Sequence, residues 1–297
     1  MNIRQLETFA VIVRLGSFSA AAAYLNSTQS TISARIQELE GDLGVSLFDR
    51  TQRRAHLTAK GRELLILAEK AVAIFTEIKH RVGAPEAISG VVRLGVSELV
   101  ALTWLPGLTA IIGERYPSLR LELDVALTHS LLNRLRSAEI DIALIPGSGF
   151  DPDLRSLSLG SVSFAWMASG STALPNRVLK PQDLACFRIL SLGPHSIHHR
   201  TVTAWLNLQR EERQPVAICN SMAVVASLTA AGYGVSLLPL THYRAEIVTG
   251  SLRVLETEPG GSSVEFFAVY STRQPAIIPQ IVAELACEAS TFGREPG

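Results

Sequence analysis

Side chains that could hydrogen-bond the edges of nucleic-acid bases gather in a short stretch near the start of the chain. At about 100° per residue, a helix over 29–43 puts Ile32, Ile36, Leu39 and Leu43 on one stripe. The opposite face carries small or amide residues, namely Ser30, Ser33, Ala34 and Gln37, and Gln29 in the first turn points into the same groove if the helix enters it N-terminus first. Slim residues allow close approach to the major groove, and glutamine offers the paired donor and acceptor that adenine needs. We expect the helix to enter the groove N-terminus first, which keeps Glu38 and Glu40 from the phosphates.

Four arginines flank this face and are expected to hold the DNA backbone. Arg35 lies on the flank of the helix, better placed for phosphate than for bases, and Arg50, Arg53 and Arg54 follow in the predicted wing. Arg53 is the candidate for the minor groove. The alternative is a solvated surface with no ligand, because residues 1–60 are only slightly basic.

The elements around this helix complete a helix-turn-helix pattern. Apolar residues recur at helical spacing from Ile3 until Gly16, and Ser17 can cap a second, alanine-rich helix. Residues 26–28 form a short polar turn before the third helix. After Gly44, the run VSLFDR, the turn TQRR and the strand AHL predict a two-stranded wing.

A long helix is predicted after the wing, capped by Thr58 and broken at Gly83 and Pro85. Its apolar positions form one stripe: Leu64, Leu67, Ala68, Ala71, Ile74, Phe75, Ile78 and Val82. A long helix with one apolar face must find another apolar surface. We therefore expect a dimerisation arm.

From Val91 the pattern changes to strand-like runs alternating with helical ones. The runs are VVRLGVS, LRLELDVAL, IDIALIP, VSFAWMAS, RILSL, PVAIC, GVSLLP and VEFFAVY. This alternation is typical of βαβ units and predicts an α/β domain with a mainly parallel sheet. The length of the region allows two lobes.

The run SFSAAAAYLNSTQSTISARIQELEGDLGVSLFDRTQRRAHLTAKG resembles the DNA-binding signature of LysR-type transcriptional regulators. The matching positions are the alanine-rich second helix, Ser33-x-x-Ile36-x-x-Leu39-Glu40, Leu43-Gly44, Leu47-Phe48-x-Arg50 and Leu57-Thr58-x-x-Gly61. The late run AAGYGVSLLP resembles a further hallmark, in the second lobe. Ser30 stands where a proline is usual in the family, and Ala34 where many members carry an arginine.

The resemblance covers the whole chain and implies its domain plan. We expect a winged helix-turn-helix over 1–58, a linker helix over 59–88 and an effector-binding domain over 89–297. In the family that domain resembles periplasmic binding proteins and has two lobes, here 91–161 with 268–297, and 162–267. The resemblance also implies homodimers, which pair into a homotetramer, and a small-molecule effector between the lobes.

The effector should lie where strands end and helices begin, because helix N-termini there present unpaired N–H groups. The candidate residues at these ends are Ser97, Glu98, Thr128, His129, Pro146, His195, Ser196, Asn220 and Ser221. The helix starts favour a small organic anion. Plain helix capping is the alternative for each polar residue.

The stretch GPHSIHHR is the most polar of these ends, and its histidines with Arg200 could receive a carboxylate. His195 and His199 have helical metal-ligand spacing, but no third ligand is evident, so no metal and no cofactor are expected. Cys186 and Cys219 could form a redox switch. Inert thiols are the alternative, since each lies within or beside a predicted buried strand.

Composition is consistent with this interpretation. Basic and acidic residues balance at 27 each, so a general nucleic-acid coat is excluded and basic surface must be local. Neither a signal peptide nor a membrane segment is predicted, which indicates a cytoplasmic protein. No P-loop, GxSxG elbow, HExxH or dinucleotide fingerprint supports an enzyme, and a transport-type binding protein leaves residues 1–88 unexplained. The expected partners are double-stranded operator DNA, an effector and further copies of the chain, with RNA polymerase as a further candidate.

Overall fold

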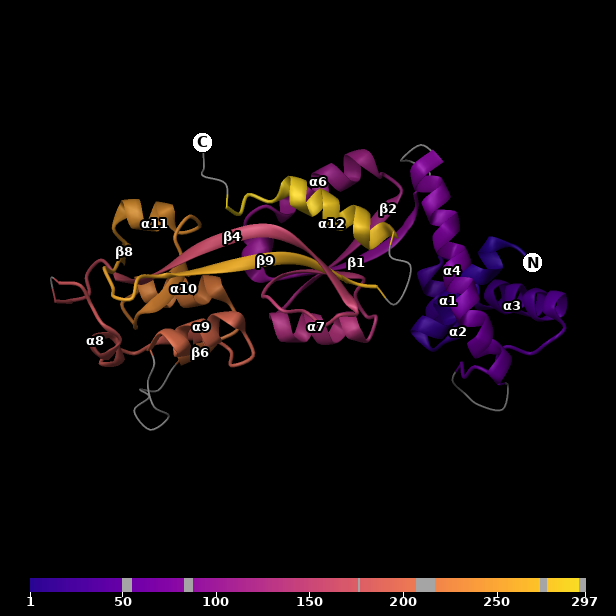
Figure 1. Cartoon of the computed structure of the whole chain (residues 1–297), viewed down its shortest axis with the longest axis horizontal. Helices are drawn as coiled ribbons and strands as arrows, with labels where there is room; N and C mark the ends of the chain where they lie inside the picture. The colour runs from indigo at the N-terminus through magenta and orange to yellow at the C-terminus, as the bar shows by residue number, and fades with distance from the viewer. Residues whose placement is uncertain (50–54, 83–87, 176, 207–216, 273–276, 294–297) are drawn as a thin grey trace. The chain divides into compact units, whose positions relative to one another are not determined.

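The computed structural model describes all residues except 50–54, 83–87, 176, 207–216, 273–276 and 294–297 (Figure 1). Within helices, the side chains of residues 76, 77, 79–82 and 185 also lie outside the description. The chain divides into two compact units. The first unit comprises Met1–Gly90 with 115–119 and 272–278, and the second unit comprises the rest.

The first unit begins with three helices, α1 (Ile3–Leu15), α2 (Phe18–Tyr24) and α3 (Gln29–Leu43). Each starts at a polar cap, because the side chains of Asn2, Ser17 and Thr28 accept backbone N–H bonds from the first turn. Gly16 ends α1 in the left-handed conformation, with φ 66°, where a side chain would be strained. The predicted helix-turn-helix is confirmed.

The core of these helices combines residues of the predicted stripes with Ile12, which the helical spacing did not identify, and with Leu47 and Phe48 from the predicted wing. Fully or nearly fully buried are Phe9, Ile12, Ala21, Ile32, Ile36, Leu39, Leu47 and Phe48. The prediction that Leu43 continues the inward stripe is wrong, since its side chain is 37% exposed. Leu43 is the last residue of α3, before Gly44 turns the chain away.

The wing is reduced to a single antiparallel bridge, Phe48 with Leu57, among the residues described. The N–H of Asp49 also donates to the carbonyl of His56 at 2.8 Å. The predicted strand over 55–57 is therefore only a bridge. Arg50, Arg53 and Arg54, assigned to the wing, lie outside the described residues.

Helix α4 (Ala59–Val82) follows as predicted, and the hydroxyl of Thr58 accepts the N–H of Gly61 at 3.0 Å. The prediction of a single stripe is wrong. Ala68 is buried in the core of α1–α3, and Leu64, Ala71 and Val72 pack against that core. A second set stays exposed, at 59% for Leu67, 58% for Ile74, 39% for Phe75 and 54% for Ile78.

The second unit is built on a seven-stranded sheet with the order β2-β1-β3-β9-β4-β7, in which β8 also pairs with β4. The strands are β1 (Gly90–Val96), β2 (Leu119–Val125), β3 (Ile142–Pro146), β4 (Leu154–Ser169), β7 (Ser236–Pro239), β8 (Leu252–Val254) and β9 (Ser262–Ser271). A separate pair, β5 (Leu190–Leu192) and β6 (Ala217–Cys219), is parallel. The three-residue β8 was missed because nothing in its sequence separates it from a loop.

The prediction of a mainly parallel sheet is wrong. Strand β1 pairs with β3 in parallel, but β3 with β9, and β4 with β9, β7 and β8, are antiparallel. The long strands β4 and β9 pair along most of their length and run through the whole unit (Figure 1). Pairs formed by segments a hundred residues apart leave no local signal of strand direction.

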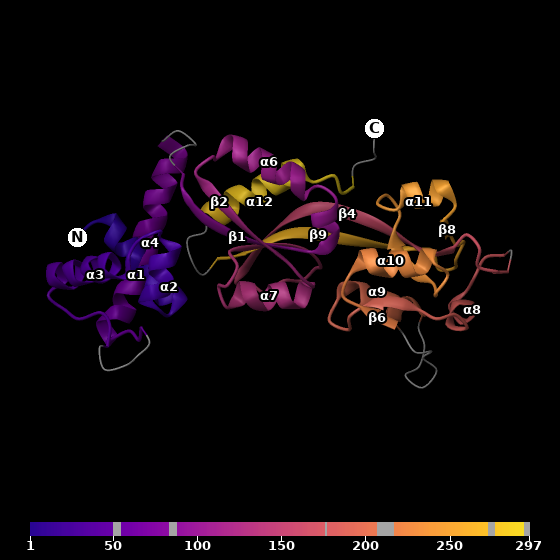
Figure 2. The ribbon, with the colours of Figure 1, turned by 180° about the vertical axis from the view of Figure 1, so that it is seen from behind.

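Eight helices accompany these strands among the described residues. They are α5 (Glu98–Leu102), α6 (Leu105–Arg115), α7 (Thr128–Arg136), α8 (Pro181–Ala185), α9 (Ile197–Leu206), α10 (Met222–Ala230), α11 (Arg244–Thr249) and α12 (Ile277–Ala289). Both views place α6 and α12 on one face of the main sheet and α7 on the other (Figures 1 and 2). Helices α9 and α10 lie beside β5 and β6 (Figure 2).

The cysteines are all free thiols. Cys186 is exposed at the end of α8, so the prediction that it lies in or beside a buried strand is wrong. Over the described residues, no single helix is long and apolar enough to cross a membrane, although the bent pair of α1 and α2 could do so on combined length and composition alone.

Candidate functional site

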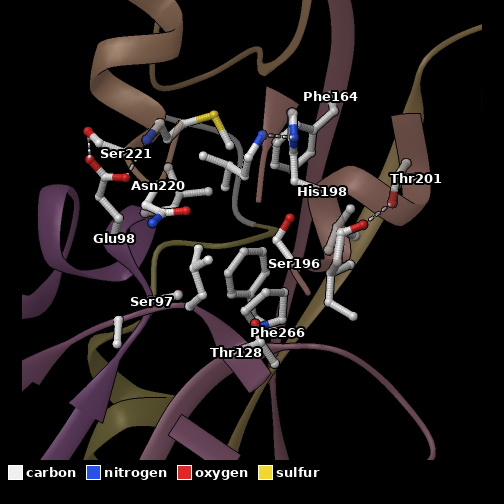
Figure 3. Close-up of a pocket in the computed structure, with 18 of the residues that line it drawn as sticks. Ser97, Glu98, Thr128, Phe164, Ser196, His198, Thr201, Asn220, Ser221 and Phe266 are labelled. Carbon is white, nitrogen blue, oxygen red and sulfur yellow. Dashed lines mark hydrogen bonds between the residues drawn. The ribbon is translucent and has the colours of Figure 1, made fainter. Parts of the chain in front are cut away.

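A pocket of about 270 Å³ opens in the second unit where several strands end and helices begin (Figure 3). The predicted residues that line it are Ser97, Glu98, Thr128, Pro146, Ser196, Asn220 and Ser221. They come from both predicted lobes and from the ends of five strands, β1, β2, β3, β5 and β6. His129 and His195, also predicted for this site, are not among the lining residues. Their rings stack on one another instead, with centroids 5.1 Å apart.

Most of the pocket wall is apolar, which the analysis of strand ends missed. The side chains of Phe164 and Phe266, from β4 and β9, line the pocket, Phe164 beside His198 and Phe266 beside Thr128 (Figure 3). The other apolar lining residues are Leu99, Val125, Ala126, Leu127, Leu192, Ile197, Met222, Leu237 and Val264. The described lining contains no lysine and no arginine. The pocket therefore suits a small molecule with an apolar body and few polar groups.

Two polar residues at one end of the pocket have hydroxyls without protein partners. Ser97 is 9% exposed and precedes α5, yet its hydroxyl caps nothing and has no hydrogen-bond partner among the described residues. Thr128 is 7% exposed, and no described residue hydrogen-bonds its hydroxyl. Thr128 also begins α7, where Leu127 offers no side-chain cap to the first N–H groups. An unmet buried donor is costly, so a ligand with acceptor oxygens would be stabilised here.

Glu98 is not a free charge at the rim of the pocket. Its Oε1 accepts the hydroxyl of Ser221 at 2.7 Å and the N–H of Ala223 at 3.4 Å, and its Oε2 accepts the N–H of Met222. These donors belong to the first turn of α10 and its cap. The carboxylate therefore neutralises the positive end of this helix.

Ser196 and Ser221 follow the capping alternative. The hydroxyl of Ser196 donates to the carbonyl of Gly193 at 2.7 Å and accepts the N–H of His199 at 3.0 Å, at the start of α9. The hydroxyl of Ser221 accepts the N–H of Val224 at 3.3 Å while it donates to Glu98. Asn220 has no side-chain hydrogen bond to a described residue, and its Oδ1 lies against Gly193, where a Cβ would come within 2.9 Å of that atom.

His198, between these ends, is a structural histidine. Its Nε2 lies 2.7 Å from the carbonyl of Leu237, and the N–H of Leu192 donates to its Nδ1 at 3.3 Å. Nε2 must then carry the proton. Burial lowers the pKa of His198 to about 4, so the ring is neutral at pH 7. The interpretation of GPHSIHHR as three histidines that receive a carboxylate is therefore wrong for His198.

The predicted reading face of α3 is largely open to solvent. Gln29, Ser30 and Gln37 are exposed, and Ser33 is half-buried. Gln29 accepts the hydroxyl of Ser19 at 3.0 Å, and the hydroxyls of Ser30 and Thr28 lie 2.8 Å apart. This face therefore consists of groups that water already solvates.

The charged residues of α3 contact neighbouring elements. Arg35 donates to the hydroxyl of Thr8 on α1 at 3.4 Å, which fixes the arginine on the flank of the helix. The Oε1 of Glu40 accepts the N–H groups of Leu47 and Phe48 at 2.7 and 3.3 Å. Glu40 therefore orders the segment that leads to residues 50–54, a role that helical spacing did not predict.

The comparisons with known proteins agree with this arrangement. Residues 3–62 match the family described as bacterial regulatory helix-turn-helix protein, lysR family, and residues 85–285 match the LysR substrate binding domain. GltR of Bacillus subtilis, an HTH-type transcriptional regulator, is 30% identical over 257 residues, which cover 85% of this chain and 84% of GltR.

Solved structures share the fold over nearly the whole chain. Full-length OxyR of Pseudomonas aeruginosa has a TM-score of 0.67 at 18% identity and covers 100% of this chain and 99% of its own. Full-length LysG of Corynebacterium glutamicum, with bound effector arginine, has a TM-score of 0.62 at 20% identity and covers 98% of each chain.

These domains define a DNA-binding transcriptional regulator that carries an effector-binding domain, and not an enzyme. The chain belongs to the LysR family of bacterial regulators.

Proposed function

We propose that the pocket of the second unit binds the effector, and that its occupancy controls DNA binding by α3. The observation that carries the proposal is the buried, unpartnered hydroxyl of Ser97, which lines a largely apolar pocket together with Thr128. A ligand that binds one of two states more tightly shifts the population towards that state. LysG, which shares the fold, is recorded with a bound effector, arginine, and this supports a small-molecule effector here as well.

The effector is an organic molecule with at least one carboxylate. Ser97, Thr128 and the N–H groups that begin α7 supply its hydrogen bonds, since helix starts favour negative charge. Pro146, Phe164 and Phe266 contact its apolar body. His129 and His195, which stack outside the pocket lining, are assigned no contact with it.

DNA is bound by the exposed face of α3 and by the wing. Gln29, Ser30, Ser33 and Gln37 contact base edges, and Arg35 holds a phosphate from the flank. Arg50, Arg53 and Arg54 complete the backbone contacts. Because its target is chromosomal DNA, the regulator works in the cytoplasm, with RNA polymerase as a further partner.

The exposed apolar residues of α4 pair two copies of the chain. Leu67, Ile74 and Ile78 follow the spacing of a helix-pairing seam, and each is more than half exposed. A homodimer presents two reading helices to two half-sites, and two dimers form the homotetramer.

Calorimetry on the full-length protein with a panel of small organic acids tests the pocket assignment. For an acid that wild type binds, Ser97→Ala and Thr128→Val should each weaken binding roughly tenfold to a hundredfold, because a hydrogen bond to a charged group is lost. Thr241→Ala, at an exposed residue outside the pocket, is the matched control. Gel shifts with the DNA around the gene should change with the same acid. If both pocket variants bind it as tightly as wild type, the effector site is elsewhere.

A further inference from the structure

We infer that Glu98 makes the pocket selective for an effector with a single carboxylate, whose far end is neutral or cationic, over one with two carboxylates. The inference rests on the proposed effector site and names the class of molecule that it accepts. It follows from a difference between two helix starts at the pocket, α7 and α10.

Helix α7 presents an unoccupied start to the pocket. Leu127 contributes no side-chain cap, and the hydroxyls of Ser97 and Thr128 have no described partner. The N-terminus of a helix carries about half a positive charge. One carboxylate of a ligand can therefore replace the missing partners at this end of the pocket.

Helix α10 presents a filled start. The Glu98 carboxylate accepts the N–H groups of Met222 and Ala223 and the hydroxyl of Ser221, which caps the same helix. The protein has thus placed its own carboxylate where a second ligand carboxylate would otherwise bind. A ligand carboxylate near it would meet a fixed negative charge in a half-buried setting, where repulsion is stronger than in water.

No cationic side chain in the described lining offsets that repulsion. The lining contains no lysine or arginine, and the only histidine in it, His198, is neutral with both ring nitrogens bonded to the backbone of Leu192 and Leu237. The pocket wall also carries Phe164, beside His198, and Phe266, beside Thr128 (Figure 3). A second charged carboxylate would be buried beside Glu98 without a positively charged partner, with the neutral amide of Asn220 as a hydrogen-bond donor.

A cationic far end is compatible with the geometry. A carboxylate has about four lone-pair sites, and Glu98 uses three of them, two on Oε1 and one on Oε2. Oε2 can accept one further hydrogen bond, which an ammonium group on the ligand can supply.

The test compares matched straight-chain acids by calorimetry on the full-length protein. At four, six and eight carbons, each monocarboxylate is measured against the dicarboxylate and the ω-amino acid of the same length. The variants are wild type, Glu98→Gln, which keeps the shape but removes the charge, and Glu139→Gln. Glu139 is an exposed acid of the same unit outside the pocket lining, and serves as the matched control for net charge.

In wild type, the best monocarboxylate or ω-amino acid should bind at least tenfold more tightly than the dicarboxylate of its length. Glu98→Gln should reduce that ratio at least fivefold by strengthening dicarboxylate binding, and Glu139→Gln should leave it unchanged. Preference of wild type for a dicarboxylate overturns the inference, even if Glu98→Gln cannot be purified folded. An unchanged ratio in Glu98→Gln also overturns the inference. If Ser97→Ala still weakens acid binding in that case, the proposed effector site is upheld. If wild type binds none of the acids, the carboxylate site itself is wrong and the inference falls with it.

Discussion

The reading face of α3 and the polar part of the pocket both carry polar side chains near helix starts, but these side chains differ in exposure and in hydrogen bonding. On α3, Gln29 and Ser30 are exposed and hydrogen-bonded to neighbours on α2 and at the helix cap. In the pocket, the hydroxyl of Ser97 is buried and unpartnered, and that of Thr128 has no described partner. A ligand in the pocket therefore supplies missing hydrogen bonds, whereas DNA on α3 must replace bonds that already exist. DNA binding by α3 therefore gains its affinity from many weak contacts, and ligand binding in the pocket from a few strong ones.

The largest expected difference between DNA binding and ligand binding comes from breaking the proposed pairing of two copies through α4. Ile74→Glu with Phe75→Glu should yield monomers and weaken binding to a DNA with two half-sites about a hundredfold or more, because the two contacts are no longer linked. Ligand binding in the pocket should not change. Sedimentation and gel shifts measure the first effects, and calorimetry the second.

Ile66→Glu is the matched control for that double variant. Ile66 is 60% exposed on the same helix but lies roughly 100° away from the seam formed by Leu67, Ile74 and Ile78. It should remain dimeric. A double variant that stays fully assembled would place the interface in the second unit.

Acid should act on the unit that holds the pocket through His198. Its pKa is about 4 in the folded protein against an ordinary 6.5, so the unfolded chain binds more protons between these values. The unfolding free energy therefore falls as pH drops from about 6.5 to 4, by about 3 kcal/mol in total from this residue.

The measurement is unfolding by denaturant at several pH values for wild type and His198→Gln. The variant should be less stable at pH 7 but lose less stability on acidification. His129→Gln, at an exposed ring, is the control and should keep the wild-type slope. Parallel slopes for His198→Gln and wild type would refute the assignment of a neutral buried ring.

The smallest effect is expected on the exposed face of α3. Gln29→Ala should cost about 1–3 kcal/mol at one operator position and relax the preference there. Arg35→Ala should instead weaken binding to all sequences alike and reduce its salt dependence. Gel shifts against a set of single-base operator variants, at two salt concentrations, distinguish the two. If Gln29→Ala lowers the affinity for operator and random DNA equally, Gln29 does not recognise a base.

Much of the fold and part of the site could be predicted because the signals are local. Helical spacing located α1, α3 and α4, and Ser17, Thr28 and Thr58 cap helices within three residues of their own position. Runs of apolar residues located most strands. Polar residues that directly follow a strand gave Ser97, Thr128 and Asn220, because strand ends meet at one edge of a sheet whatever the order of the strands.

The errors concern contacts between distant segments. Leu64 and Leu67 look alike on a helical wheel, yet only Leu64 packs on the core of the first unit. Phe164 and Phe266 are indistinguishable from ordinary strand residues until β4 pairs with β9. The sequence does not show that His198 is buried while His195 is not.

The sequence by itself determined the helix-turn-helix, the long helix after it, the α/β class of the rest and the strand ends that meet at the pocket. Periodicity and capping act over a few residues and can be recognised in the chain. Only the tertiary structure decided that Glu98 faces Ser221, more than a hundred residues away, and so fills the start of α10 while α7 stays open. Charge in a pocket depends on which distant groups meet there, and that is set by how the strands pair.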